Sequence, residues 1–420
     1  MTSPLLGRVY PAPAGNLATD TQFQQTLEAF DGALETAFTA ADTEANTSSS
    51  ISILSASDPG LLYERHHTTD LVAQATTGTN EVDGDSIYRI ASISKLLTVY
   101  TFLVEAGDRH LNAPITDYMP ELLAARAGAD FPRPRWEELT LAELASHLSG
   151  LARDFGLDDL AVDANGAGGN YMSLKDLSTV GRSILRSDLL SKAQTRRWMK
   201  PKSLLADMTK AVGMPWEIER IYVDGRTVDL YTKDGDWHMY DSRLVLVPDF
   251  DIGFCILTAS DSATVKREAG LKVLSIVSDE IQEVVLPALE SIAKRKAERA
   301  FAGSYASNSD GVSHSIVVDV DAQPGLKVTE WVYNGTDVLG ELGRPWTSRN
   351  QVFDLRLQSN ELYGGKMVGF TGVFGKAAWE TVDLYRYGNI GVEQFAFEVD
   401  NSGVAVSVRS VALRDTLKRS

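Results

Sequence analysis

The pattern of hydrophobic residues changes near residue 300, and this change constrains the fold more than any other feature of the 420-residue sequence. Downstream of it, short stretches such as HSIVVDVD, VFDLRLQ and VAVSVRSVAL alternate polar and apolar residues between turn signals, which is typical of an all-β module. A chain of this length also exceeds one typical hydrophobic core. We therefore predict two domains, at 1–300 and 303–420.

The upstream region predicts a mixed α/β fold, with an antiparallel sheet flanked by helices. A helical pattern at 23–41 precedes a strand at SISILSA, and a second strand is expected at DLVAQATTG. Residues 92–210 are expected to be mostly helical, with a helical lobe at about 96–210. Four strand patterns then precede a long helical pattern over 262–299; they are IERIYVDG, RTVDLYTKDG, WHMYDSRLVLVP and DIGFCILTA.

Net charge and hydropathy limit the classes of partner that the chain is expected to bind. The 40 Lys and Arg residues and 57 Asp and Glu residues give a net charge of −17, which argues against nucleic acid or an anionic membrane. The longest apolar stretches are too short to span a bilayer. The N-terminal segment lacks the pattern of a signal peptide, so we expect an intracellular protein or a secreted one whose leader has been removed. The β module could dock against the rest of the chain and narrow its cleft, or it could mediate homo-oligomerisation.

Cysteine and histidine usage argues against a metal site, and we expect no cofactor. The single cysteine, Cys255 in IGFCILTA, excludes an intrachain disulfide and a thiolate zinc cluster, and is expected to be an inert buried thiol. No H-E-x-x-H or comparable carboxylate cluster occurs. His66 and His67, in YERHHTTD, are expected at a surface turn or a strand end.

The stretch YRIASISKLLTVYTFLV places Ser92 three residues before Lys95, at a strand-to-helix junction. A helix N-terminus offers unpaired N–H groups to developing negative charge, and a spacing of three puts both side chains on one face. The pair is therefore either a nucleophile with its base or only the polar start of a buried helix. A second copy, Ser291 and Lys294, lies inside a long helical pattern and is expected to be solvated helix surface.

Four segments, in the correct order over about residues 50–285, resemble the serine β-lactamase-like family. That family includes class C β-lactamases, penicillin-binding DD-peptidases, family VIII esterases and lovastatin-type acyltransferases. The chain particularly resembles fungal β-lactamase-related proteins that carry an extra C-terminal β domain, which fits residues 303–420. The four segments are SIYRIASISKLLTVYTFLVEAG, LTLAELASHLSGLARDFG, GAGGNYMSLKDLSTVGRSIL and YTKDGDWHMYDSRLVLVPDFDIGFCIL.

The resemblance implies roles for individual residues. Ser92 would accept the acyl group and Lys95 would take its proton. Lys233, in the K-D-G that stands where the family has K-T-G, would bind a substrate carboxylate or another anion and help lower the pKa of Lys95. Gly235 would let substrate approach closely, and the backbone N–H groups of Ser92 and Asp236 would form an oxyanion hole. Substrate contacts are also expected at Tyr171, Trp237 and His238.

Lys233, and a histidine that precedes the SGL turn, also have structural interpretations. Lys233 could be a turn lysine in a KDGD hairpin, because Asp-Gly is a common hairpin turn. His147, in SHLSGL, could suggest a Ser-His triad, but the family pattern makes it a structural histidine at a helix end.

One motif of the family is missing. Relatives have Tyr-x-Asn between the SGL and AGG turns, where the tyrosine assists proton transfer, but here 16 residues without this motif separate Gly150 from Ala167. Tyr171, Tyr231 and Tyr240 are weak substitutes, because proton transfer requires hydrogen-bond reach of the serine. Either the helical lobe is reduced, or the sequence joins residues across a segment that is not recorded. The latter would leave a Cα step longer than about 3.8 Å within 150–168.

The resemblance implies a serine hydrolase or acyltransferase that acts on a small-molecule ester, thioester or amide through an acyl-Ser92 intermediate. The missing motif leaves open a non-hydrolytic member of the fold, which binds a ligand or catalyses a cyclisation or isomerisation. A penicillin-sensitive wall peptidase is less favoured, because no membrane anchor is apparent and the C-terminal module is fungal-like; the fold alone does not decide.

Overall fold

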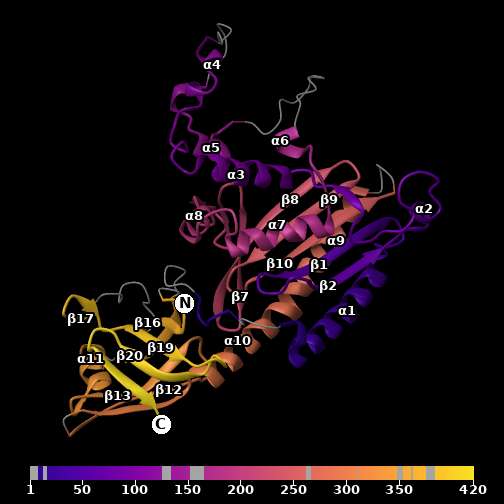
Figure 1. The fold of residues 1–420 in the computed structure, drawn as a ribbon. Coiled ribbons are helices and arrows are strands. Elements are labelled where there is room, and N and C mark those ends of the chain that lie inside the picture. Colours follow the sequence, from indigo (N-terminus) through magenta and orange to yellow (C-terminus); the bar gives the residue numbers. More distant parts are fainter. Residues whose placement is uncertain are drawn as a thin grey trace. The chain divides into compact units, whose positions relative to one another are not determined.

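Contacts within the computed structural model divide the chain into two units (Figure 1). We call them the sheet unit, comprising Gln24–Ile221 and Asp229–Val284, and the barrel unit, comprising Met1–Phe23, Tyr222–Val228 and Val285–Ser420. Residues 285–300 thus group with the barrel, and the domain boundary near 300 stays a prediction. The structure describes residues 8–12, 17–124, 134–151, 165–261, 266–309, 311–347, 353–360, 363–374 and 384–420.

An eight-stranded sheet in the order β2-β1-β10-β9-β8-β7-β6-β5 forms the centre of the sheet unit, as the expected fold class requires. Strands β7 to β10 are consecutive in the chain and adjacent in the sheet. They correspond to the four strand patterns expected before residue 262. The strands are β1 (Thr47–Ser55), β2 (Leu61–His67), β5 (Ser203–Leu204), β6 (Lys210–Val212), β7 (Glu217–Val223), β8 (Arg226–Trp237), β9 (Tyr240–Val247) and β10 (Ile252–Ser260).

Helices cover both faces of this sheet. On β9, Leu244 and Leu246 face Gly181 of α7, whereas Arg243, the residue before Leu244, donates a hydrogen bond to Ser278 of α9 at 2.9 Å. Successive side chains of a strand point to opposite faces, so α7 and α9 lie on opposite sides. The helices are α1 (Thr21–Ala41), α2 (Asp70–Ala73), α3 (Ile93–Ala106), α4 (Glu121–Ala124), α5 (Leu141–Ala145), α6 (Asn165–Gly168), α7 (Leu174–Arg186), α8 (Lys192–Trp198) and α9 (Lys266–Glu280).

The prediction of a strand at DLVAQATTG is wrong. Residues Asp70–Ala73 form the short helix α2 instead, because the Thr69 hydroxyl accepts a hydrogen bond from the backbone N–H of Val72 and caps the helix. A further two-stranded ribbon pairs β3 (Ile87–Arg89) with β4 (Tyr171–Ser173). This ribbon leads directly into α3.

Cys255 is a free, fully buried thiol on β10, as the sequence predicts. Burial raises the pKa of this thiol to about 12, although the Ser178 hydroxyl lies 3.7 Å from its sulfur. Because the thiolate is the reactive form, we expect no maleimide labelling of the native protein at pH 8 or pH 9 and complete labelling in guanidinium chloride. Intact-mass spectrometry would measure this, and rapid labelling without denaturant would contradict the buried position.

The barrel unit contains a closed antiparallel barrel. The strand order β12-β11-β21-β20-β19-β16-β15-β13 is closed by an additional pairing of β12 with β13. Its core includes ring contacts of Phe301 with Phe370 and Phe397. The strands are β11 (Gly303–Ser309), β12 (Val312–Asp319), β13 (Leu326–Tyr333), β14 (Thr336–Asp337), β15 (Leu355–Ser359), β16 (Met367–Phe374), β17 (Arg386–Tyr387), β18 (Ile390–Gly391), β19 (Gln394–Val399), β20 (Ala405–Ser410) and β21 (Asp415–Arg419).

Two helices accompany the barrel. Helix α10 (Leu286–Phe301) follows a π-helical segment, Ile281–Val285, and contributes Phe301 to the barrel core. Helix α11 (Val338–Thr347) follows β14 and adds one helix to the module that the sequence predicts as all-β.

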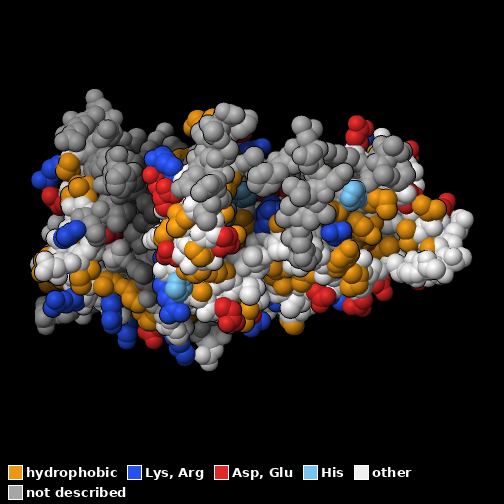
Figure 2. Space-filling view, turned by 90° about the horizontal axis from the view of Figure 1, so that it is seen from above, with side chains coloured by type: hydrophobic (Ala, Val, Ile, Leu, Met, Phe, Trp, Pro, Cys, Tyr) orange, Lys and Arg blue, Asp and Glu red, His pale blue; other side chains and the backbone are white. Residues whose placement is uncertain are grey.

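Both signs of charge are present on the face seen from above, where Lys and Arg side chains alternate with acidic and apolar ones (Figure 2). Among the helices of the described ranges, none combines the length and the hydropathy needed to span a bilayer.

Candidate functional site

Ser92 stands at the junction between β3 and α3. The preceding residue, Ala91, has φ 44°. Residues other than glycine rarely adopt this left-handed conformation, and where they do, the position is often part of a functional site. Ser92 occupies the N-cap position of α3, yet its side chain forms no capping hydrogen bond. The hydroxyl of this half-buried residue is therefore not used to begin the helix, and it points to Lys95 instead.

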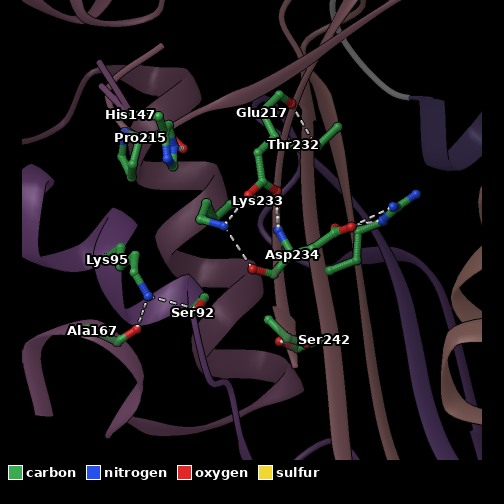
Figure 3. A network of polar contacts seen from close by, with 12 residues as sticks. Ser92, Lys95, His147, Ala167, Pro215, Glu217, Thr232, Lys233, Asp234 and Ser242 are labelled. Atoms are coloured by element: carbon green, nitrogen blue, oxygen red, sulfur yellow. Dashed lines mark hydrogen bonds and ion pairs between the residues drawn. The ribbon is translucent and has the colours of Figure 1, made fainter. Parts of the chain in front are cut away.

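Lys95 Nζ donates hydrogen bonds to Ser92 Oγ at 2.9 Å and to the carbonyl oxygen of Ala167 at 2.7 Å (Figure 3). The segment that carries Ala167 is held against α3, because Thr98 Oγ1 donates to the Gly166 carbonyl at 2.7 Å. The structure thus brings Ser92 and Lys95 within reach for proton transfer. Both residues are half-buried, so the hydroxyl is not sealed in the core.

Gly235 lies directly against the Ser92 segment. A Cβ at this position would overlap the Ile90 carbonyl oxygen and the Ser242 hydroxyl, and would lie 3.0 Å from the backbone nitrogen of Ser92. Ser242 Oγ donates to the same Ile90 carbonyl at 2.9 Å and ties β9 to the junction. Only glycine fits here, and Asp236 follows it immediately along β8.

Lys233 lies inside β8, two residues before Gly235 and on the same face of the strand. The β8–β9 hairpin turns after Trp237, which pairs with Tyr240, so the interpretation of Lys233 as a turn lysine is wrong. Figure 3 shows Lys233 facing the same space as Ser92 and Lys95. The structure therefore brings the three predicted side chains to one place.

Glu217 is the partner of Lys233, and sequence reasoning missed it. Lys233 Nζ lies 2.6 Å from Glu217 Oε1, and the backbone N–H of Asp234 donates to Glu217 Oε2 at 3.0 Å (Figure 3). A signal for this pair existed in the sequence. The Asp224–Gly225 turn, with φ 42° and 93°, joins β7 to β8, and counting back from it places residue 217 opposite residues 232–234.

The predicted substrate-contact residues surround a second missed residue, Arg89. Its guanidinium lies 4.3 Å from the Trp237 ring centre and 5.5 Å from the Tyr171 ring centre, and its Nε donates to the Gly168 carbonyl at 3.3 Å. Tyr171 is 57% exposed, so this cation–aromatic cluster remains accessible. His238 lies next to Trp237 in the exposed β8–β9 turn.

The remaining candidates have structural positions. His147 Nε2 donates to the Pro215 carbonyl at 3.1 Å, which joins its turn to the segment before β7. Tyr231 is in the core against Trp216, and burial raises its pKa, so it is not placed to exchange protons with Ser92. His66 and His67 lie at the end of β2. Within the described ranges, no group of three or more His, Cys, Asp or Glu residues could hold a metal ion.

The missing Tyr-x-Asn motif belongs to a segment that the structure does not describe. Residues 152–164 lie outside the described residues, and so does the proposed check of Cα spacing within 150–168. Tyr171, the tyrosine next along the chain, is paired through β4 with Arg89 of β3 and lies over the Arg89 guanidinium. It therefore belongs to the aromatic cluster.

Comparison with known proteins finds similarity in both units. A family profile described as "Beta-lactamase" matches residues 61–166, and one described as "Beta-lactamase-like-like, C-terminal domain" matches residues 293–420. A beta-lactamase-like protein of Arthroderma benhamiae is 24% identical over 545 residues, which cover 88% of this chain and 87% of that relative. Because this chain has 420 residues, the aligned part of the relative contains segments that are absent here.

Two further fungal relatives match a smaller part. The beta-lactamase-like protein str6 of Strobilurus tenacellus is 30% identical over 41% of this chain and 56% of its own length. The probable hydrolase M10 of a Phoma species is 27% identical over 43% of this chain and 29% of its own length.

Solved structures give weaker similarity. An octameric penicillin-binding protein homologue from Pyrococcus abyssi aligns with a TM-score of 0.45 and 13% identity over 93% of this chain and 99% of that one. A beta-lactamase/D-alanine carboxypeptidase from Yersinia pestis, complexed with citrate, aligns with a TM-score of 0.46 and 15% identity over 65% of this chain and 99% of that one.

Proposed function

We propose that this chain, which belongs to the serine β-lactamase-like family, hydrolyses or transfers the acyl group of an ester, thioester or amide through a covalent intermediate on Ser92. Family membership and the hydrolase-named relatives support a serine hydrolase in general terms. The finer proposal depends on one observation, the 2.9 Å hydrogen bond between Lys95 Nζ and Ser92 Oγ at the start of α3.

In the proposed reaction, Lys95 in its neutral form takes the Ser92 proton while Ser92 Oγ forms a bond to the acyl carbon. The bond to the leaving group then breaks, and the leaving group takes the proton from the Lys95 ammonium. Water, or an acceptor alcohol or amine, attacks the acyl-Ser92 ester and transfers its own proton through Lys95 back to Ser92. Hydrolysis and acyl transfer differ only in this second nucleophile.

The negative charge that develops on the acyl oxygen needs donors in fixed positions. We assign the backbone N–H groups of Ser92 and Asp236 to this oxyanion hole. The close contact between Gly235 and the Ser92 backbone supports this assignment, because it brings the edge of β8 next to the start of α3. The Arg89, Trp237 and Tyr171 cluster would contact the part of the substrate beyond the reacting group.

A non-hydrolytic role is the second candidate, because the sequence lacks the Tyr-x-Asn motif that assists proton transfer in relatives. Such a protein would keep the fold and bind or isomerise a ligand without a covalent step. It would retain full function when the Ser92 hydroxyl is removed.

Reaction with a fluorophosphonate tests the proposed covalent step. Intact-mass spectrometry of the folded protein should show one adduct, and peptide mapping should place it on Ser92. The Ser92→Ala variant should form none. A folded wild-type protein that stays unmodified at high fluorophosphonate concentration would count against acyl chemistry and favour the non-hydrolytic role.

We expect the Gly235→Ala variant to react with the fluorophosphonate about 100-fold more slowly than the wild type. The added methyl group would overlap the Ile90 carbonyl, so β8 must move away from Ser92, and displacements of about 1 Å cost rates of this size. Gly32→Ala is the matched control, because nothing lies within 4 Å of its added Cβ. Equal rates for wild type and Gly235→Ala would remove Asp236 from the oxyanion hole.

A further inference from the structure

We propose that Glu217 determines substrate specificity by withholding Lys233 from carboxylates, so that Ser92 acts on acyl compounds without a carboxylate beside the scissile bond. This inference depends on the proposed function. It also reverses the role expected for Lys233 from the sequence, which was to bind a substrate carboxylate.

The contacts of Glu217 hold its carboxylate over the lysine. Oε1 lies 2.6 Å from Lys233 Nζ, and Oε2 accepts the Asp234 backbone N–H at 3.0 Å, so both oxygens have a fixed donor. Lys233 Nζ also donates to the carbonyl oxygen of Asp234 at 2.9 Å. The ammonium is thus directed to groups of the protein itself.

Exposure shows which member of the pair a ligand would meet. The Lys233 side chain is 4% exposed, whereas the Glu217 side chain is 40% exposed. A substrate that approaches this pair from solvent therefore meets a carboxylate before it meets the ammonium. A second carboxylate would be repelled by Glu217 unless it displaced Glu217 from both donors, whereas an uncharged group would meet no such repulsion.

The other acidic residue near Lys233 cannot take over this role. The Asp234 carboxylate is held by Arg243, whose Nε and Nη2 lie 2.7 Å and 2.6 Å from its two oxygens. Asp234 follows Lys233 in the strand, so its side chain points to the opposite face. Removing the charge of Glu217 should consequently leave the Lys233 cation available to an anionic substrate.

The Glu217→Gln variant can test this role without loss of the strand pairing. A glutamine side-chain oxygen can still accept the Asp234 N–H, and the Thr232 hydroxyl bonds to the backbone carbonyl of residue 217, which the substitution retains. The variant therefore changes the charge beside Lys233 and little else.

The experiment compares two esters of one acyl group, a m-carboxyphenyl ester and the neutral m-carbamoylphenyl ester of the same shape. The wild type should have the higher kcat/KM for the neutral ester. In Glu217→Gln, the ratio of kcat/KM for the anionic ester to that for the neutral ester should rise at least about tenfold. Glu219→Gln, a matched loss of one negative charge on β7, should leave this ratio unchanged. Adding Lys233→Met to Glu217→Gln should abolish the rise.

The outcomes separate the inference from the proposed function. If neither ester is hydrolysed and Ser92 forms no fluorophosphonate adduct, the proposed function fails and the inference fails with it. If the neutral ester is hydrolysed but the wild type prefers the anionic ester, only the inference is overturned, even should the variant fail to fold. An unchanged ratio in a folded Glu217→Gln protein also overturns it.

Discussion

Replacing Ser92 by alanine is expected to lower kcat on a neutral aryl ester by about 10⁴- to 10⁶-fold, as deletions of catalytic nucleophiles do. Without the hydroxyl, no acyl-enzyme can form, and only the binding groups and backbone donors around the junction remain. Steady-state hydrolysis, followed by release of the phenol, measures the loss. Circular dichroism should show an unchanged fold, because the Ser92 side chain forms no capping hydrogen bond with α3.

The chain supplies a matched control for this prediction. Ser291 and Lys294 repeat the same spacing on α10, where Ser291 is exposed and its hydroxyl accepts a hydrogen bond from the Gln22 side chain at 3.3 Å. Ser291→Ala should leave kcat unchanged, which would show that the strand-to-helix junction, and not the spacing alone, creates the reactive serine. A Ser92→Ala protein with wild-type turnover would exclude the acyl-serine mechanism.

Lys95 and Ser92 should also behave as one unit. Lys95→Ala leaves the hydroxyl without the group that its proton would enter, so it should lose turnover by several orders of magnitude. The double variant should be no slower than the slower single variant, because each substitution already removes the shared step. Additive losses would mean that Lys95 acts elsewhere.

The sequence predicted those parts of the fold in which local pattern and tertiary environment agree. Strands β7 to β10 were found because strand-like stretches alternate there with short turns, such as that at Asp224–Gly225. The segment after Thr69 was predicted as a strand but forms a helix. The hydrogen bond from the Val72 N–H to the Thr69 side chain caps this helix, and the strand pattern of so short a stretch is weak. The barrel also requires β11 to pair with β21, where Tyr305 lies opposite Arg419, and no local pattern encodes a pairing between segments so distant in the chain.

The same distinction applies to the candidate site. The proximity of Ser92 and Lys95 follows from helix periodicity and was predicted from their spacing. Glu217 and Arg89 were missed, because they reach the site through a cross-strand contact and a ring contact, which helix periodicity does not predict. For Glu217, the hairpin register would have sufficed. For Arg89, the pairing of β3 with β4 spans 82 or more positions and had no signal in the sequence.

The second large effect concerns stability. Arg226 and Glu290 form an ion pair within the barrel unit, with Nε and Nη2 of Arg226 lying 3.0 Å and 2.8 Å from Glu290 Oε2. Each side chain is 3% exposed. Replacing Arg226 removes the guanidinium that pairs with this buried carboxylate, and breaking a buried pair costs about 3–5 kcal/mol. Arg226→Met should therefore lower the thermal midpoint of the unit by roughly 10 °C in differential scanning calorimetry.

Two comparisons test whether loss of the buried ion pair is the cause. The double variant Arg226→Met/Glu290→Leu should regain most of the lost stability, because apolar residues of similar volume can replace a buried ion pair at little cost. Arg344→Met should shift the free energy of unfolding by less than about 0.5 kcal/mol, because Arg344 and its partner Glu341 are 72% and 51% exposed. If Arg226→Met lowered the free energy of unfolding as little as Arg344→Met, the Arg226–Glu290 pair would have to be accessible to water in solution. The pair would then contribute little to holding the β7–β8 turn against α10.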